Sequence, residues 1–167
     1  MDKEYDIAKI CINGHVVNSS VTNKPDYNKK YCKKCGSETI TNCPKCNAAI
    51  EGDCYTIIYD YDGPIKHKTE SYILPSFCHN CGKAYPWTEK KIHTSQMLIA
   101  ESENISPEEK EIIFRSIDDI IKDTPETIYS ANKIKKILPK LGKEIAKGFR
   151  DIIVDVASET AKKILFP

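Results

Sequence analysis

The chain has 167 residues, enough for one ordinary domain or two small ones, and its formal net charge of +1 does not indicate a nucleic-acid partner. No apolar run approaches the roughly 18 residues of a transmembrane helix, and the first residues, MDKEYDIAKI, contain no apolar signal segment. We therefore expect a cytoplasmic protein whose eight cysteines bind metal rather than form disulfides.

The first half of the chain has the side-chain pattern of short strands. In residues 7–19, β-prone side chains flank Asn13-Gly14, a pair typical of a tight turn between two strands. Residues 54–61 alternate so that Tyr55, Ile57, Tyr59 and Tyr61 share one face, and residues 66–74 return after a turn at 62–64. These patterns predict two separate pairs of antiparallel strands.

After Trp87 the apolar spacing changes from a period of two to a period of 3.6, which is typical of helices. Hydroxyl residues followed by proline and glutamate mark two of the expected helix starts. The sequence therefore predicts an α+β protein with a β-rich domain over residues 1–90 and a helical domain over residues 91–167. Four helices are expected: from Thr88 to about Ser102, from Ser106 through Ile121, from Thr124 to about Pro139, and over about residues 140–165.

Four pairs of potential metal ligands lie in the first 81 residues. Three are Cys-x-x-Cys pairs, in which a tight turn directs both sulfurs at one ion, and the fourth has the less common Cys-x-x-x-His spacing. Glycine follows the second cysteine in two of the pairs, where it tolerates the positive φ of such a turn. The expected ligands are Cys11, His15, Cys32, Cys35, Cys43, Cys46, Cys78 and Cys81.

Four ligand pairs can form two tetrahedral zinc sites in three ways: sequential, nested or interleaved. We favour the sequential arrangement, in which the pairs at 11/15 and 32/35 share one ion and the pairs at 43/46 and 78/81 share the other. Each half then begins with a ligand pair on a turn, continues through a loop or hairpin, and ends in a Cys-x-x-Cys-Gly turn. The nested arrangement leaves the hairpin at 54–74 without a role.

These motifs carry a family resemblance. The segment from Cys11-Ile-Asn-Gly-His15 to Cys32-Lys-Lys-Cys35-Gly36 resembles one half of a double zinc ribbon, and the segment from Cys43 to Tyr85-Pro86-Trp87 is similar to the other half. Over about residues 7–90 the chain resembles an uncharacterised family of bacterial zinc-ribbon proteins of unknown function. The resemblance implies metal binding at the eight ligands and no established activity.

Both sites contain four protein ligands, which favours two structural Zn²⁺ ions per chain. Iron in a site of four thiolates is the alternative metal. The fourth ligand of the first site also has an alternative, because Cys54 is a spare thiol that can replace His15. Otherwise we interpret Cys54 as a buried strand residue.

We expect a non-enzymatic interaction protein, since no nucleophile, base and orienting residue form a recognisable motif. A protein partner is the first expectation. A nucleic acid is the second, bound by a basic aromatic surface. The side chains expected on that surface are Tyr55, Tyr59, Tyr61, Tyr72, Tyr85, Trp87, Lys29, Lys30, Lys33, Lys34, Lys45 and Lys83.

The last part of the chain suggests another kind of partner. Residues 133–167 carry nine basic and four acidic side chains, and apolar residues recur there at helical spacing. A basic amphipathic segment over residues 133–166 can bind an anionic membrane or a partner helix. The alternative is a helical bundle that buries these apolar positions internally. The apolar last helix also makes self-association an expectation.

Overall fold

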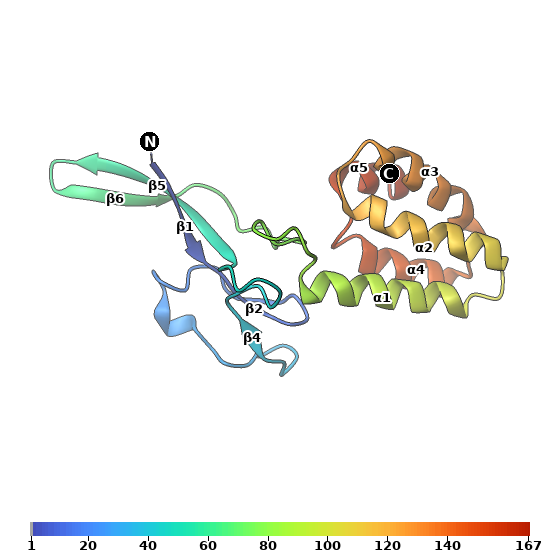
Figure 1. The fold of residues 1–167 in the computed structure, drawn as a ribbon, viewed down its shortest axis with the longest axis horizontal. Coiled ribbons are helices and arrows are strands. Elements are labelled where there is room, and N and C mark those ends of the chain that lie inside the picture. Colours follow the sequence, from blue (N-terminus) through green and yellow to red (C-terminus); the bar gives the residue numbers. More distant parts are fainter. Residues whose placement is uncertain (1) are drawn as a thin grey trace. The chain divides into compact units, whose positions relative to one another are not determined.

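The computed structural model describes residues 2–167 and confirms the α+β class: strands lie in the first half of the chain and helices in the second (Figure 1). The chain divides into two compact units, the first ending at Thr88 and the second extending from Glu89 to Pro167. The sequence predicts the division after residue 90. Within residues 2–167, no helix is long and apolar enough to cross a membrane.

The first unit contains two antiparallel three-stranded sheets, with strand orders β1-β5-β6 and β3-β2-β4. β5 and β6 form the long hairpin visible in Figure 1. The strands are β1 (Asp2–Ile7), β2 (Lys9–Cys11), β3 (Val16–Asn18), β4 (Thr39–Ile40), β5 (Glu51–Asp60) and β6 (Gly63–Lys68), and a short 3-10 helix spans Pro25–Tyr27.

Three features of this unit differ from the sequence-based expectation. β1 was not expected, because its sequence DKEYDI is largely charged, and it lies at the edge of its sheet. β5 begins at Glu51, three residues earlier than predicted, and β6 ends at Lys68 instead of continuing to residue 74. After Lys68 the chain leaves the sheet because Tyr72 and Leu74 pack against the core cluster of the unit.

A buried carboxylate organises the loop that follows β3. Asp6 is 6% exposed, and its oxygens accept hydrogen bonds from the Ser20 hydroxyl and from the backbone N–H groups of Ile7, Thr22 and Asn23. Burial alone raises the pKa of Asp6, but these donors stabilise the ionised form more strongly and hold the pKa well below its usual range. The loop therefore folds around a negative charge.

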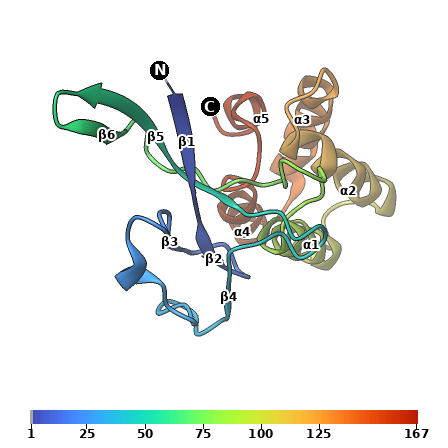
Figure 2. The ribbon, with the colours of Figure 1, turned by 60° about the vertical axis from the view of Figure 1, so that its left-hand side comes forward.

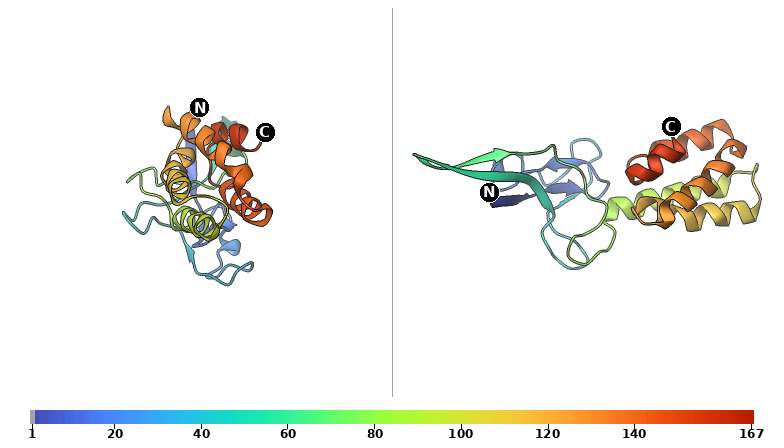
Figure 3. Two further views of the ribbon diagram at one scale, coloured as in Figure 1. Left: turned by 90° about the vertical axis from the view of Figure 1, so that its right-hand side faces the viewer. Right: turned by 90° about the horizontal axis from the view of Figure 1, so that it is seen from above.

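The second unit is a bundle in which α2 packs against α3 and α3 against α5 (Figures 2 and 3). Its core consists largely of isoleucines, including Ile113, Ile117 and Ile134, which are fully buried. The helices are α1 (Pro86–Glu101), α2 (Pro107–Ile121), α3 (Glu126–Ile137), α4 (Lys143–Ile153) and α5 (Glu159–Leu165), with a 3-10 turn at Leu138–Lys140.

The predicted start of α2 is confirmed. Ser106 accepts a hydrogen bond from the backbone N–H of Glu109, and the Glu109 carboxylate accepts one from the backbone N–H of Ser106. This reciprocal pair is a capping box. Pro107 occupies the first turn, where its missing N–H costs nothing.

Two other predicted starts are wrong in detail. Thr88 does not cap α1, which begins at Pro86, because the Thr88 hydroxyl donates to the Ser76 carbonyl inside the first unit. Thr124 does not cap α3, whose N-cap position is held by Pro125 without a side-chain hydrogen bond. Neither threonine therefore occupies the N-cap position that its motif predicts.

The single last helix expected over residues 140–165 is also wrong, since α4 ends at Ile153 and α5 begins at Glu159. Ser158 starts α5: its hydroxyl accepts from the backbone N–H of Ala161, while its own N–H donates to the Ile120 carbonyl at the end of α2. This tertiary hydrogen bond fixes the break, which the unbroken apolar stripe does not reveal.

Candidate metal centres

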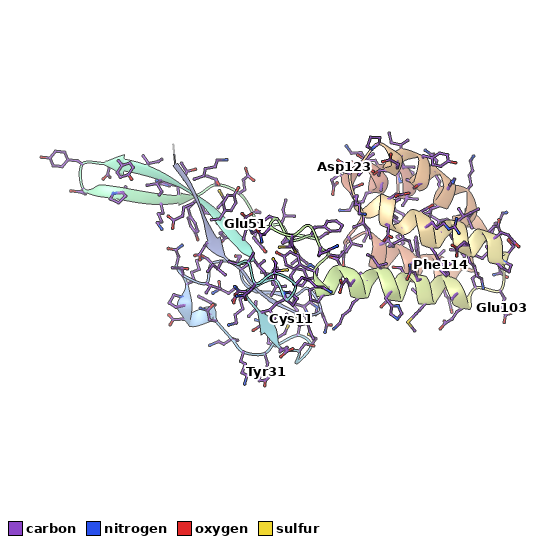
Figure 4. The ribbon with its side chains drawn as sticks, viewed as in Figure 1. Cys11, Tyr31, Glu51, Glu103, Phe114 and Asp123 are labelled. Carbon is purple, nitrogen blue, oxygen red and sulfur yellow. The ribbon has the colours of Figure 1, made fainter. Side chains whose placement is uncertain are left out.

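The first ligand group is assembled by strand ends and loops of the first unit. Cys11 ends β2 (Figure 4), His15 precedes β3, and Cys32 and Cys35 lie on the loop before β4. The Sγ atom of Cys11 lies 3.5 Å from His15 Nδ1 and 3.7 Å from Cys35 Sγ, and His15 Nδ1 lies 3.6 Å from Cys32 Sγ. The four ligand atoms all lie within 4.8 Å of one another.

The second group joins the loop between β4 and β5 to the loop before α1. Cys43 Sγ lies 3.9 Å from Cys81 Sγ, and Cys46 Sγ lies 3.6 Å from Cys78 Sγ. These four sulfurs also lie within 4.8 Å of one another. The structure thus brings the ligand pairs together in the sequential order, which excludes the nested and interleaved arrangements for this fold.

Both groups have the dimensions of a tetrahedral metal site. With zinc–sulfur bonds of about 2.3 Å, two sulfurs at tetrahedral corners lie about 3.8 Å apart. A sulfur and an imidazole nitrogen lie about 3.6 Å apart. The observed sulfur–sulfur distances of 3.6 to 3.9 Å agree with this geometry and are far from a bonded disulfide, at about 2.05 Å. The two groups can therefore each hold one metal ion.

Three of the ligand turns have the same backbone hydrogen bonds. In each, the N–H of the residue after the second cysteine donates to the carbonyl of the first cysteine, at 2.7 to 2.9 Å. That residue has a positive φ in all three turns: Gly36 at 70°, Asn47 at 61° and Gly82 at 67°. Asparagine tolerates this conformation better than most residues, so Asn47 replaces the glycine of the other two turns.

The turn that contains His15 is closed differently. Gly14, with a φ of 90°, lies between the two ligands, and its N–H donates to the Cys11 carbonyl over 2.8 Å. A Cβ atom at Gly14 would lie 2.9 Å from Trp87 Cβ, so only glycine allows this turn to pack against the tryptophan. The first ligand group is thereby tied to the segment that follows the second.

The aromatic residues that follow the second ligand group belong to the buried core of the first unit. Tyr85 and Trp87 are each 1% exposed, and their rings stack with centroids 4.6 Å apart. Trp87 Nε1 donates to the Pro75 carbonyl over 2.8 Å. Both belong to one cluster with Cys43 and Cys78. The two rings are therefore structural and unavailable to a ligand, contrary to the expectation that they form a surface.

Two asparagines that the sequence-based expectation overlooked orient the ligands. Asn13 Nδ2 lies 3.5 Å from Cys35 Sγ, and Asn80 Nδ2 lies 3.5 Å from Cys46 Sγ, in both cases as a donor. Each asparagine stands two residues after the first ligand of its turn, and each donates to the opposite turn of the same group. This repeated spacing was the signal in the sequence that could have identified them.

Donors to sulfur also stabilise thiolates. The hydroxyl and backbone N–H of Ser37, followed by Asn13, lower the pKa of the Cys35 thiol to about 5. The Asn80 amide is the leading cause of a lowered pKa at Cys46. Because metals bind the thiolate and not the thiol, these donors favour the ligand form of both side chains.

The two candidates for the fourth ligand of the first group lie apart. His15 directs Nδ1 at the sulfurs of Cys11 and Cys32. Cys54 lies within β5, opposite Tyr5 of β1, and belongs to neither ligand group. The geometry therefore places His15, and not Cys54, in the first group.

Comparisons with known proteins identify one family. The model of a family described as "uncharacterized protein conserved in bacteria (DUF2321)" matches residues 4–165, a range that includes both ligand groups and all five helices. Neither the curated proteins nor the solved structures give a match. The family match extends the resemblance seen in the first half of the sequence into the helical unit. Because the match covers almost the whole chain, the protein belongs to this family of bacterial proteins.

Proposed function

We propose that the protein is a non-enzymatic interaction protein whose first unit is stabilised by two structural zinc ions. The main support is that each group offers four protein ligand atoms within 4.8 Å of one another. A catalytic zinc site retains a position for water or substrate, so four protein ligands favour a structural ion. Zinc suits the mixed thiolate and imidazole set of the first group, and iron is the competing metal for the four thiolates of the second.

Zinc binding also explains how so small a core holds the first unit together. Apart from the cysteines, the buried core cluster found in the described part of this unit contains only Ala8, Ile10, Ile50, Tyr85 and Trp87. A structural zinc ion contributes roughly 10–16 kcal/mol of apparent binding free energy in small zinc domains. Two such ions supply more than enough to offset the limited apolar burial.

The β5–β6 hairpin is the surface that we assign to a protein partner. Tyr59 is 70% exposed and Tyr61 is fully exposed, and Ile58 and Ile65 are each more than 40% exposed on the same hairpin. β6 is an edge strand, so no other strand among residues 2–167 pairs with its outer backbone groups. Exposed aromatics and free sheet edges are recurrent features of protein-binding surfaces.

Affinity capture with the zinc-loaded full chain tests this role. A protein partner should be retained by the wild type and lost from a Tyr59→Ser/Tyr61→Ser variant that still binds two zinc ions. A Tyr129→Ser variant is the matched control, because Tyr129 is similarly exposed but lies on α3. Equal capture by all three proteins would exclude the hairpin as the binding surface.

A second candidate function is binding of single-stranded nucleic acid by the first unit. A pocket of about 170 Å³ next to the first ligand group is lined by Tyr27, Tyr31 and three lysines, Lys29, Lys33 and Lys34. Tyr27 and Tyr31 are 63% and 56% exposed, so bases can stack on them while lysines contact phosphates. This candidate replaces the expected aromatic surface, because Tyr55, Tyr85 and Trp87 are buried.

Fluorescence anisotropy with short single-stranded DNA and RNA tests this candidate. Binding should weaken with increasing salt, by about 0.7 log units in the association constant per log unit of salt for each phosphate contacted. A Tyr27→Ala/Tyr31→Ala variant should bind several-fold more weakly. Binding that is absent, or unaffected by both salt and the substitutions, would rule the candidate out.

The membrane or partner-helix alternative for residues 133–166 has less support than the two candidates above. The apolar positions Ile134, Phe149 and Ile153 are fully buried in the helical bundle, as is Ala161. A segment that binds a membrane through its apolar face needs that face exposed. The same burial removes the apolar last helix as an argument for self-association.

A further inference from the structure

A pocket of about 180 Å³ opens in the first unit beside the beginning of β5 and the segment that follows β6. Its acidic and phenolic lining residues are Tyr5, Glu51, Asp53, Glu70 and Tyr72. Figure 4 shows Glu51 at this end of β5, apart from Tyr31, which belongs to the basic pocket. Sites for drug-sized ligands measure about 300–1,000 Å³. This pocket therefore has the size for a single side-chain group.

An irregularity in the sheet creates the pocket. The β1–β5 register shifts between Tyr5, which faces Cys54, and Ile7, which faces Glu51, so β5 contains one extra residue at this point. The backbone N–H of Asp53 leaves the ladder and donates to the Ser19 carbonyl over 2.7 Å. Such bulges change the direction of a side chain and are frequent next to functional sites.

Gly52 is required for this bulge. A Cβ atom there would lie 2.3 Å from the Ser19 carbonyl oxygen and 2.7 Å from the Ile7 carbonyl carbon, both of which are backbone atoms. Neither atom can move without breaking the sheet, so any larger residue would disrupt the bulge. The position of Asp53 is thus built into the fold.

Two buried polar groups of the pocket have unfilled hydrogen-bonding capacity. Asp53 is 1% exposed, and its Oδ1 atom lies 2.9 Å from Lys68 Nζ. The contact with Lys68 is an ion pair without hydrogen-bond geometry, so among residues 2–167 neither oxygen of Asp53 has a hydrogen-bond partner, and neither does the Tyr72 hydroxyl. Buried polar atoms without partners are rare and costly in folded proteins. Their presence in one pocket points to a ligand that supplies the missing donors.

The charge of the pocket selects the kind of ligand. Three carboxylates line it, whereas the basic side chains nearby are Lys68, paired with Asp53, and the imidazole of His79, 3.9 Å from Glu51. Burial, followed by the negative charges of Asp53 and Glu51, raises the pKa of Tyr72 above its usual range. Burial by itself opposes any charge, but the negative charges of Asp53 and Glu51 attract a cation and repel an anion.

A metal ion is not the cation that this pocket fits. Within the described part of the chain, the groups whose ligand atoms come close enough to share an ion are the two cysteine-rich ones alone. The carboxylates of this pocket are spread more widely. An organic cation with several N–H donors can reach separated acceptors, since an ammonium group has three donors and a guanidinium group five.

We propose that this pocket binds the ammonium or guanidinium group of a lysine or arginine side chain from a partner protein. The cation, which has only hydrogen-bond donors, donates to Asp53 Oδ2. The Tyr72 hydroxyl oxygen is a second acceptor for it. Glu51 and Glu70 add negative charge at the entrance. The inference rests on the proposed protein-binding role and specifies the chemistry that the partner presents.

NMR titration of the ¹⁵N-labelled, zinc-loaded full chain tests the proposal. The probes are three blocked pentapeptides, Ala-Ala-X-Ala-Ala, in which X is lysine, arginine or the neutral norleucine. The lysine and arginine peptides should shift the amide signals of residues 51–54 and 70–73 in a saturable manner, and the norleucine peptide should not. Equal shifts with norleucine would overturn the proposal, as would tighter binding of free cadaverine than of the lysine peptide.

Substitutions separate binding from folding. Asp53→Asn should weaken peptide binding at least about tenfold, and Tyr72→Phe several-fold, since charged hydrogen bonds contribute more than neutral ones. Tyr72→Phe removes a hydroxyl that has no partner, so this variant should fold at least as stably as the wild type. Glu38→Gln is the matched control, because Glu38 is exposed in the same unit and does not line the pocket.

The outcomes also distinguish this proposal from the proposed function. If Asp53→Asn and Glu38→Gln bind the lysine peptide equally, the pocket is not the cation site, whatever the hairpin variants show. If zinc counting finds fewer than two ions per chain, the structural-zinc role fails independently of peptide binding. Peptide binding that is weakened in Asp53→Asn and Tyr72→Phe but not in Glu38→Gln, with two zinc ions retained, supports both.

Discussion

At the scale of single residues, the two candidate metal centres contain more than their eight potential ligands. Asn13 and Asn80 each donate a hydrogen bond to a sulfur of the opposite turn. Groups of this kind orient ligands and adjust their basicity, and their loss commonly weakens metal binding about 10- to 100-fold. The equivalent position of the two asparagines in the two halves indicates the same role in both.

Asn80→Ala should therefore weaken zinc binding by about 10- to 100-fold at the second group, because Cys46 loses its side-chain donor. Competition with a chromophoric chelator measures the affinity. Asn132→Ala is a suitable control, since Asn132 is exposed on α3 and its amide contacts only the Ile128 carbonyl among the described interactions. Equal zinc affinity of the two variants would show that the Asn80 contact has no influence on the metal.

The grouping of the ligands makes a separate prediction about zinc stoichiometry. Cys35→Ser and Cys43→Ser should each leave one zinc ion per chain, and the double variant should retain none, because the two cysteines belong to different groups. Cys54→Ser should retain two, since Cys54 lies outside both groups. Elemental analysis of the purified proteins checks all four. A double variant that keeps one ion would mean that Cys35 and Cys43 share a site.

At the scale of secondary-structure elements, the same motif has different consequences in different places. Ser106 and Thr124 both precede Pro-Glu, and both predict a capped helix start. Only Ser106 forms the cap, together with Glu109. At the start of α3 the Thr127 hydroxyl makes the hydrogen bonds instead. It accepts from the Thr124 N–H and lies within donating distance of the carbonyls of Asp119 and Lys122. The link to α2 thus replaces the local cap.

This difference is measurable as stability. Ser106→Ala should lower the free energy of unfolding of the helical unit by about 1 kcal/mol, because the Glu109 N–H loses its partner. Thr124→Ala should change it by less than about 0.5 kcal/mol, because Thr124 is exposed and its side chain does not cap α3. Urea unfolding followed by circular dichroism compares the two. A larger effect at Thr124 would contradict the observed cap.

At the scale of the whole molecule, the two units are stabilised by different means. The first unit combines a small apolar cluster with two ligand groups, and Trp87 packs against both Gly14 and Tyr85. The second unit buries isoleucines and alanines from several helices and contains no member of either ligand group. Metal removal should therefore affect the units unequally.

Chelation of zinc should unfold the first unit and leave the helical unit folded. Trp87, the only tryptophan in the chain, is 1% exposed and reports on the first unit through its fluorescence. We expect a red shift of its emission on chelation, while the helical far-UV circular dichroism signal is mostly retained. Readdition of zinc should reverse the shift. Simultaneous loss of both signals would show that the units fold as one.

Acidification should have the same selective effect, because thiolate and imidazole ligands bind metal only in their deprotonated forms. As the pH falls, protonation of the ligands competes with zinc and removes the stabilisation that the metal gives to the first unit. The tryptophan shift should therefore occur at a higher pH than any loss of helical signal.

Much of the candidate site was predictable because its signals are local. The spacing of each Cys-x-x-Cys pair, together with the glycines after Cys35 and Cys81, determines a turn that directs two sulfurs to one side. The turn chemistry around Asn13-Gly14 likewise determines the strand pair that carries Cys11 and His15. The capping box at Ser106 needs only four consecutive residues. In each case the interacting groups are close in the sequence.

Other features depend on partners that are distant in the sequence. Pairing with β5 makes a strand of the charged segment Asp2–Ile7, and the contact of Ser158 with the Ile120 carbonyl divides the last helix. The bulge at Gly52 depends on the approach of the Ser19 backbone and decides where Asp53 points. The sequence by itself thus determined the candidate metal ligands and the α+β class through short-range geometry. Only the tertiary structure decided their grouping, the helix break and the acidic pocket, because these result from long-range backbone contacts.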